Sequence, residues 1–279
     1  MPDPITINYA QRYSPLVDER FKLGALTNSI VNQSYSWIDV DTVKVYSIPV
    51  VSMNDYTLTG SSRYGTANEL GNSVQTLTLE QDRSFTFTID RKSEQDTMGV
   101  MAAAAALRRQ IDEVVIPEID AYRIAALVAG AGNSVATEAT KANAYEVFLA
   151  MQEKLDDDKA PAGGRVAIVT PAFYNKLKLD STFLKNSDLG QRMLLNGQVG
   201  EVDGVPIVKV PSSYFPAGVH ALITNPVCAP SPIKLQDFKI HDNPPGINGY
   251  LIEGRFRYDC FVLTNKADGI VYNGVVSTT

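Results

Sequence analysis

Cysteine and histidine are scarce in this sequence, although many disulfide, metal and catalytic sites depend on them. Among 279 residues the only cysteines are Cys228 and Cys260, too few for a disulfide framework, so we expect two reduced, buried thiols. The only histidines, His220 and His241, offer little for a metal site or a general base, and we expect both to be structural. No N-terminal apolar stretch resembles a signal peptide.

Long apolar runs and basic runs are also lacking. The longest apolar stretches, around Met98–Leu107 and Ile124–Val128, are shorter than the roughly 20 residues that span a bilayer, so we predict no membrane role. Lysine and arginine occur at most in pairs such as Arg91-Lys92, and the net charge is -6. Because a protein whose main task is gripping nucleic acid needs clustered basic residues, the sequence argues against that class.

The motifs of common enzyme classes are missing. No Gly-x-Ser-x-Gly elbow and no Gly-Lys-Ser or Gly-Lys-Thr phosphate-binding loop occurs. The run Gly130-Ala131-Gly132 has Val135 where a dinucleotide fingerprint requires its third glycine, and we interpret the run as a helix stop. Asp156-Asp157-Asp158 is followed by Ala160 at the third ligand place of a calcium loop, which favours a solvated helix end. The sequence therefore predicts no catalytic, cofactor-binding or metal-ligating residue, and no enzyme.

The most informative feature that is present is an alternation of apolar and polar residues from Val74 to Asp90. The apolar positions are Leu77, Leu79, Phe85, Phe87 and Ile89. This period of two predicts one half-buried strand, which at about 3.4 Å per residue is too long for a compact core. We expect it to be the return strand of a hairpin whose first strand lies within residues 37–51 and whose polar tip is residues 54–72.

A long helix is predicted to follow the strand without a loop. Ser93 and Asp96 resemble a capping box. An apolar stripe comprises Val100, Ala104, Leu107, Ile111 and Val114, and it resumes at Ile119, Tyr122 and Ala126. Between these runs Pro117 removes an amide donor and is expected to kink the helix. Gly130 and Gly132 are expected to end it.

The second half of the sequence alternates between helix and strand signals. A helix is indicated by Ala144, Val147, Phe148, Met151 and Leu155, and another helix is expected at residues 191–195. A buried strand is expected at residues 166–169, and further strands are expected at residues 207–210, 220–224, 233–240, 250–263 and 269–272. Thr170-Pro171 predicts a helix start, and Asp203-Gly204 predicts a primed hairpin turn.

Four segments in this order resemble the major capsid protein family of tailed bacteriophages, whose fold is shared with encapsulins. They are QDRSFTFTIDRKSEQDT (81–97), LRRQIDEVVIPEIDAYRIAALVAGAG (107–132), GEVDGVPIVKVPSS (200–213) and GRFRYDCFVLTNKADGIVYNG (254–274). The resemblance covers nearly the whole chain. It implies an α+β fold with an N-terminal arm, an extended β-hairpin loop, a peripheral domain with a long spine helix, and an axial α/β domain.

The same resemblance implies domain boundaries. The N-terminal arm would be residues 1–34 and the extended loop residues 35–91. The peripheral domain would comprise residues 92–132, including the spine helix, together with residues 229–265. The axial domain would comprise residues 133–228 and 266–279. With only about 34 residues before the extended loop, a separate scaffolding protein is expected in place of a built-in scaffolding segment.

The function implied is architectural. Identical subunits would form pentamers and hexamers of an icosahedral shell, assembled in the host bacterial cytoplasm with a portal, and the virion would enclose double-stranded DNA held by non-specific contacts. An acidic wall suits packaged DNA because a basic lining would bind the genome. Some relatives crosslink through a lysine in the extended loop, and Lys44 is the only lysine between Val40 and Arg91, which does not by itself predict that chemistry.

Two other functions remain open from the sequence. An encapsulin-like nanocompartment would use a related fold to enclose a cargo enzyme. A soluble enzyme with an α/β core would need a pocket that holds perturbed acids beside His220 or His241.

Overall fold

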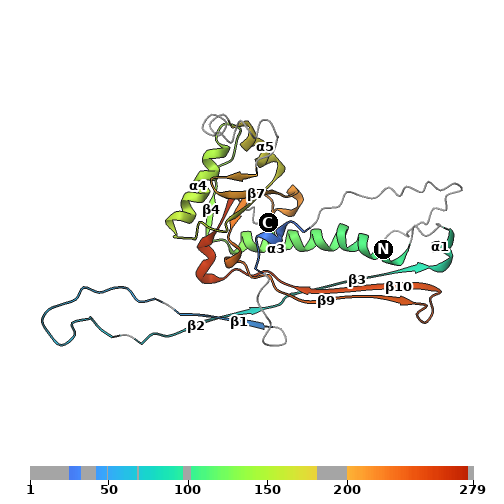
Figure 1. Cartoon of the computed structure of the whole chain (residues 1–279), viewed down its shortest axis with the longest axis horizontal. Coiled ribbons are helices and arrows are strands. Elements are labelled where there is room, and N and C mark those ends of the chain that lie inside the picture. The colour runs from blue at the N-terminus through green and yellow to red at the C-terminus, as the bar shows by residue number, and fades with distance from the viewer. Residues whose placement is uncertain are drawn as a thin grey trace.

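In the computed structural model the chain forms a body, a helix that lies along a long sheet, and a thin hairpin that projects away from both (Figure 1). The structure describes residues 25–32, 42–48, 50–67, 69–96, 102–180 and 200–275. The helix predicted at residues 191–195 and most of the predicted N-terminal arm lie outside these ranges.

The body is built on a six-stranded mixed sheet with strand order β4-β11-β8-β5-β7-β6. The strands are β4 (Asn133–Val135), β5 (Val166–Val169), β6 (Glu201–Val202), β7 (Val205–Lys209), β8 (Val219–Thr224) and β11 (Ile270–Gly274). All four residues of β5 are buried, because helices cover both faces of the sheet. This confirms the buried strand predicted at residues 166–169.

Helices α4 (Ala144–Asp157) and α5 (Pro171–Leu179) cover one face of this sheet. The five apolar positions predicted for the first of them are all buried on it: Ala144, Val147, Phe148, Met151 and Leu155. Helix α5 begins as predicted, with the Thr170 hydroxyl accepting a hydrogen bond from the Phe173 amide and Pro171 in the first turn. The predicted hairpin turn is also present, since Asp203 (φ 50°) and Gly204 (φ 77°) both have left-handed backbone conformations between β6 and β7.

The other face is covered by α3 (Ile116–Gly130) and by residues 25–32, which include a short 3-10 helix, η1 (Thr27–Ser29). Ile30 is fully buried there beside Ile124 and Leu127. The last part of the predicted arm is therefore packed on its own chain.

A second, three-stranded antiparallel sheet extends away from the body with the order β3-β10-β9. Its strands are β3 (Gln81–Asp90), β9 (Ile233–Asp242) and β10 (Gly249–Tyr258), each ten residues long. Helix α2 (Ala103–Gln110) and the start of α3 lie along one face of it, as Figure 1 shows. The predicted alternation holds through β3, where Phe85, Phe87 and Ile89 point toward the helices.

The strand predicted from Val74 to Asp90 is in fact two strands that belong to different sheets. Residues Ser73–Thr78 form β2, which pairs with β1 (Thr42–Ser47) in the projecting hairpin, whereas β3 pairs with β10. The break falls at Leu79 and Glu80, where the Glu80 amide donates to the Asp259 carboxylate instead of to a neighbouring strand. Alternation continued through the break because Leu79 is buried like its neighbours in the pattern.

The strand passes directly into helix α1 (Arg91–Asp96), as predicted, but the expected cap is wrong. The helix begins two residues before Ser93, and the carboxylate of Asp90 accepts a hydrogen bond from the Lys92 amide at 2.8 Å. Asp90 therefore caps the helix while it is still the last residue of the strand. Ser93 is buried in the first turn.

The long predicted helix is also divided. Ala102 has an extended backbone (ψ 130°), so α2 starts anew at Ala103. Between α2 and α3 lies a π-helical segment, η2 (Ile111–Val115), directly before Pro117. The wider turn moves the apolar stripe by one residue, so that Val115 is buried and the predicted Val114 is 46% exposed. The helix stop at Gly130 is confirmed.

Strand β10 ends at Tyr258, five residues before the predicted end at Leu263. The amides of Asp259, Phe261 and Leu263 still donate to the carbonyls of Pro232, Pro230 and Cys228. Because prolines have no N–H group, Pro230 and Pro232 cannot return these bonds, and no ladder forms. We call residues 259–263 the junction segment.

The packing predicts a large effect at the centre of the body. Replacing Phe148, which is fully buried between α4 and the sheet, by alanine is expected to lower the free energy of unfolding by about 3–5 kcal/mol in urea titrations. The matched change Val50→Ala, at a side chain 96% exposed in the hairpin, is expected to alter it by less than about 0.5 kcal/mol. Equal effects of the two changes would contradict the assigned core.

Candidate functional site

Exposed apolar side chains are concentrated on the projecting hairpin. Of the sixteen large apolar side chains that are exposed among the described residues, ten lie between positions 46 and 74. They are Tyr46, Ile48, Val50, Val51, Met53, Tyr56, Leu58, Tyr64, Leu70 and Val74. Met53 is 99% exposed and Leu58 is 81% exposed. An apolar patch of this kind marks a surface that another molecule covers.

The tip of the hairpin has a defined local shape. The Thr57 amide donates to the carbonyl of Arg63 at 3.1 Å, and the Ser62 hydroxyl donates to the carbonyl of Gly65 at 2.6 Å. The rings of Tyr56 and Tyr64 meet edge to face, with their centroids 5.0 Å apart. The tip therefore presents its apolar side chains in a fixed arrangement.

The base of the hairpin is fastened to the junction segment. The Gln75 side chain donates to the Val262 carbonyl at 3.1 Å and accepts from the Thr264 amide at 3.0 Å. Leu77 is buried against Leu263. Beyond this base nothing in the described part of the chain covers residues 50–60, all of which are exposed.

A buried polar network lies beneath the junction segment. Arg123, 2% exposed on α3, donates to the side chains of Ser231, Thr27 and Asn28. Asp120, on the same helix, accepts from the Thr27 hydroxyl at 2.5 Å and from the Leu26 amide at 2.9 Å. Burial lowers the pKa of Arg123, and the nearby carboxylate of Asp120 opposes that shift. These bonds hold residues 25–32 against α3.

A shallow apolar groove lies between the helices and the three-stranded sheet. Phe85, Val114, Val115, Ile119, Phe256 and Tyr258 line it, together with four polar or charged residues, and its volume is about 180 Å³. Strand β10 passes beneath Phe85 at Gly254, where any larger residue would overlap the ring. The two charged residues that line it are paired with each other, Arg83 with Glu118 at 2.6 Å. The groove therefore suits an apolar occupant.

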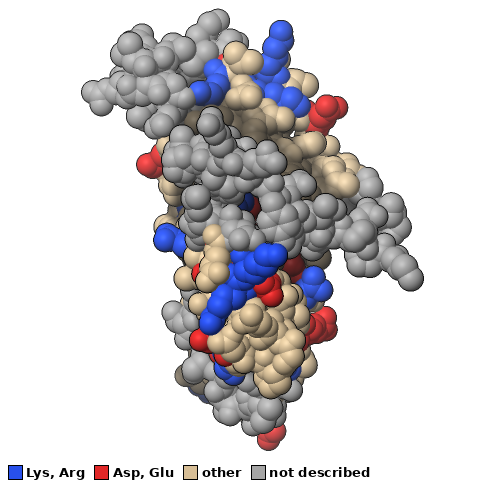
Figure 2. Space-filling view, turned by 90° about the vertical axis from the view of Figure 1, so that its right-hand side faces the viewer, with Lys and Arg blue, Asp and Glu red and all other residues tan. Residues whose placement is uncertain are grey.

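The opposite face of the three-stranded sheet is polar. Arg255 makes two hydrogen bonds to Asp82, at 2.9 and 2.5 Å, and this contact lowers the pKa of the Asp82 carboxyl. Lys239 and Asp237 are 3.0 Å apart. Figure 2, which views the molecule from the end of this sheet, shows basic and acidic side chains interspersed among the described residues that face the viewer. Interspersed charges of both signs weaken the field of either sign.

The residues singled out in the sequence have structural surroundings. His241 lies 3.2 Å from Glu253 on the polar face, and His220 is half-buried on β8 of the other sheet. The structure does not bring the two together. Both cysteines are buried, as predicted, at 5% exposure each. In the ranges that the structure describes, no three His, Cys, Asp or Glu side chains are grouped to hold a metal, and no helix is long and apolar enough to cross a membrane.

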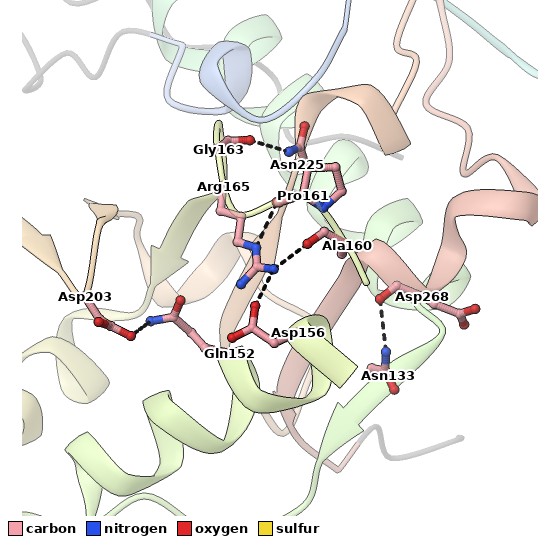
Figure 3. Close-up of polar contacts among 10 residues, drawn as sticks. All are labelled: Asn133, Gln152, Asp156, Ala160, Pro161, Gly163, Arg165, Asp203, Asn225 and Asp268. Carbon is pink, nitrogen blue, oxygen red and sulfur yellow. Dashed lines mark hydrogen bonds and ion pairs between the residues drawn. The ribbon is translucent and has the colours of Figure 1, made fainter. Parts of the chain in front are cut away.

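One carboxylate of the acidic run at the end of α4 binds a buried arginine, so the prediction of a solvated helix end is only partly correct. Asp156 lies 2.7 Å from the guanidinium of Arg165, which also donates to the carbonyls of Ala160 and Pro161 (Figure 3). Arg165 is 3% exposed. The close-up also shows Gln152 donating to Asp203 and Asn225 donating to the Gly163 carbonyl. These contacts fasten the loop after α4 and do not form a reactive site.

Comparison with known proteins gives matches over nearly the whole chain. A family model described as phage capsid protein matches residues 73–273. Similar solved structures include the capsid of the cyanophage P-SCSP1u, with a TM-score of 0.75, 14% identity, and coverage of 97% of this chain and 94% of that one. A structure from Mycobacterium phage Che8 has a TM-score of 0.70 and 17% identity, with 98% of both chains covered.

A virus-like particle from Pyrococcus furiosus is also similar, with a TM-score of 0.57, 13% identity, and coverage of 90% of this chain and 92% of that one. Among curated proteins no match is found. At these identities the solved structures establish the fold, and the predicted α+β fold of the tailed-phage capsid type is confirmed.

The buried thiol of Cys260 predicts a loss of stability at alkaline pH. Burial raises its pKa from 9.0 to about 12, so above pH 9 the unfolded chain releases a proton that the folded chain keeps. The free energy of unfolding should therefore fall as pH rises from about 9 to 12, by up to about 1.4 kcal/mol per pH unit.

Urea titrations between pH 8 and 10 test this, with Cys260→Ala as the comparison. The variant should lose this part of the pH dependence. Burial also raises the pKa of Cys228, in the same core cluster, so Cys228→Ala should lose a smaller part of it. An unchanged slope in Cys260→Ala would contradict the assignment. The buried hydroxyls of Tyr122 and Tyr258, whose pKa values burial also raises, act in the same direction at higher pH.

Proposed function

The chain belongs to the phage capsid protein family, and from that premise we propose that it builds an icosahedral shell as pentamers and hexamers of identical subunits. The family makes it a structural protein of the virion capsid. The shell would enclose double-stranded DNA, and assembly would take place in the host bacterial cytoplasm.

The observation that carries this proposal is the exposed apolar hairpin. Full burial of a large apolar side chain contributes about 1.5–3 kcal/mol, so several such side chains can hold two subunits together. An isolated two-stranded ribbon is marginal in water and gains stability by lying on another surface. Repetition around a closed ring makes each later contact effectively intramolecular, so individually modest contacts suffice.

The apolar groove beside Phe85 and Val114 is the proposed receiving surface on a neighbouring copy. It and the hairpin lie on different parts of the same chain, so their contact is heterologous, and contacts of this type generate rings when the rotation closes. The two charged residues of its lining, Arg83 and Glu118, are paired with each other and leave no net charge that would oppose an apolar occupant.

The proposed domains keep their sequence boundaries. Residues 35–91 are the extended loop, with the hairpin at its centre. Residues 92–132 and 229–265 are the peripheral domain, to which the three-stranded sheet contributes β9 and β10. Residues 133–228 and 266–279 are the axial domain, which contains the six-stranded sheet.

Partners beyond the chain itself are proposed on chemical grounds. A net charge of -6 and the interspersed charges of Figure 2 support non-specific, weak contact with packaged DNA, because a strongly basic lining would hold the genome. A separate scaffolding protein and a portal complete the proposed assembly.

The hairpin surface is testable by a triple variant, Val50→Ser, Met53→Ser and Leu58→Ser. Because these side chains are 81–99% exposed, the free energy of unfolding of the subunit should change by less than about 0.5 kcal/mol per site. Negative-stain microscopy and sedimentation, with a co-expressed scaffold, should show loss of closed shells. The matched triple Ser52→Ala, Thr59→Ser and Ser61→Ala changes exposed polar positions of the same loop and should still assemble.

A wild-type protein that stays monomeric at high concentration with scaffold would contradict the proposal, and so would normal shells from the apolar triple variant.

The likeness to the virus-like particle supports one second candidate, a nanocompartment shell around a cargo enzyme. The contents of purified particles separate the two functions. Nuclease-protected double-stranded DNA supports the capsid, whereas a co-purifying enzyme without DNA supports the compartment.

A further inference from the structure

The chain changes sheets at a single point next to the hairpin. Residues up to Thr78 belong to the hairpin sheet, and residues from Gln81 belong to the three-stranded sheet. Only Leu79 and Glu80 lie between them. Their backbone conformation therefore sets the direction in which the hairpin leaves the sheet.

One buried carboxylate contacts this point. Asp259, 3% exposed, accepts a hydrogen bond from the Glu80 amide through Oδ2 at 2.8 Å. Its other oxygen, Oδ1, accepts from the Tyr122 hydroxyl of α3 and from the Cys260 amide, both at 2.7 Å. Asp259 is thus held by the helix while it holds the bend. Hydrogen bonds to an ionised acceptor are about twice as strong as neutral ones.

A second attachment lies five residues earlier along the strand. Gln75 bonds to the backbone of Val262 and Thr264, and Leu77 packs on Leu263 between the two attachments. Both attachments end in or beside the junction segment. The hairpin is therefore attached to the junction segment at two points, Gln75 and Glu80. Two points of attachment fix the direction of the hairpin, whereas one would let it rotate.

We propose that the Asp259–Glu80 hydrogen bond is a latch that sets the direction of the hairpin, and that Asp259 is a positioning residue for assembly. The latch lies at the base of the hairpin, away from the exposed side chains that meet another subunit. Its effect on shell geometry rests on the proposed function, whereas its effect on the direction of the hairpin does not.

Two variants remove the same bond from its two sides. In Asp259→Asn the amide group can keep its oxygen toward Tyr122 and Cys260, and its NH₂ group then faces the Glu80 amide, donor against donor. Glu80→Pro removes the backbone N–H and leaves the carboxylate intact. The matched controls are Tyr122→Phe, which removes a different bond to the same carboxylate, and Glu80→Ala, which keeps the backbone N–H.

The direct measurement is a distance distribution in the unassembled full chain. Nitroxides at Asn72→Cys and Ser84→Cys, both exposed positions, would be separated by roughly 40 Å at about 3.3 Å per residue. The native thiols are buried. Pulsed electron resonance should show a distribution about twofold wider in Asp259→Asn and Glu80→Pro than in the wild type, because the bend samples more conformations. Glu80→Ala should match the wild type, and Tyr122→Phe, which keeps the Glu80 bond but frees Asp259 from the helix, should broaden the distribution less than the latch variants do.

An unchanged distribution in both latch variants would overturn the proposal, and so would equal broadening in the controls. If one latch variant fails to fold, the other still tests the bond. In shells formed with scaffold, the latch variants are expected to lose the single size class of the wild type, whereas Phe148→Leu, which weakens the core of the body, should keep it. If neither the wild type nor any variant forms shells, the result counts against the proposed function. The distance measurement still tests the latch in that case.

Discussion

The structure depends on five extended residues, the junction segment from Asp259 to Leu263. Strand β10 of the three-stranded sheet runs into it, the hairpin is fastened to it through Gln75 and Glu80, and it leads through η5 (Thr264–Gly269) to β11 of the body. Its amides bond to carbonyls of residues 228–232, a stretch whose prolines cannot return the bonds. Three sheets therefore share one short connection, and three of its amides find backbone acceptors without a regular strand ladder.

In this arrangement the side chains that stabilise the fold and the side chains proposed to bind other subunits lie in different parts of the chain. The body buries an apolar cluster on each face of its six-stranded sheet. The hairpin exposes most of the large apolar side chains that remain uncovered among the described residues, and its contacts with the chain are confined to its base. In a monomer the apolar side chains of the hairpin are exposed to water, which is unfavourable. In a shell of many copies a neighbouring subunit would cover them.

The sequence predicted the regular elements well because their signals are local. The stripe of α4, the buried β5, the Thr170 cap and the Asp203-Gly204 turn each depend on residues within one or two turns of chain, and all are present. The errors have two sources, a neighbouring residue or turn that changes the expected pattern and a partner far away in the sequence. Asp90 replaced Ser93 as the helix cap, a signal that was present in the sequence as an acid directly before the helix. Val115 replaced Val114 because a π turn inserted one residue into the stripe.

The contacts of Asp259 and the groove beside Phe85 had no local signal, since their partners lie more than 100 positions apart or on separate elements.

The sequence by itself determined the local signals of several strands and helices, among them α4, β5 and α5, which side chains are apolar, and the order of motifs that resembles the family. Only the tertiary structure decided that the alternating run of residues 74–90 is shared between two sheets, with Leu77 packed on Leu263 and with Phe85 and Ile89 packed on the helices. Period-two alternation records which side of a strand is apolar, and it is the same whichever element that side packs on. The run breaks where the Glu80 amide donates to the carboxylate of Asp259, a residue 179 positions away, and no local pattern in the sequence predicts a contact over that separation.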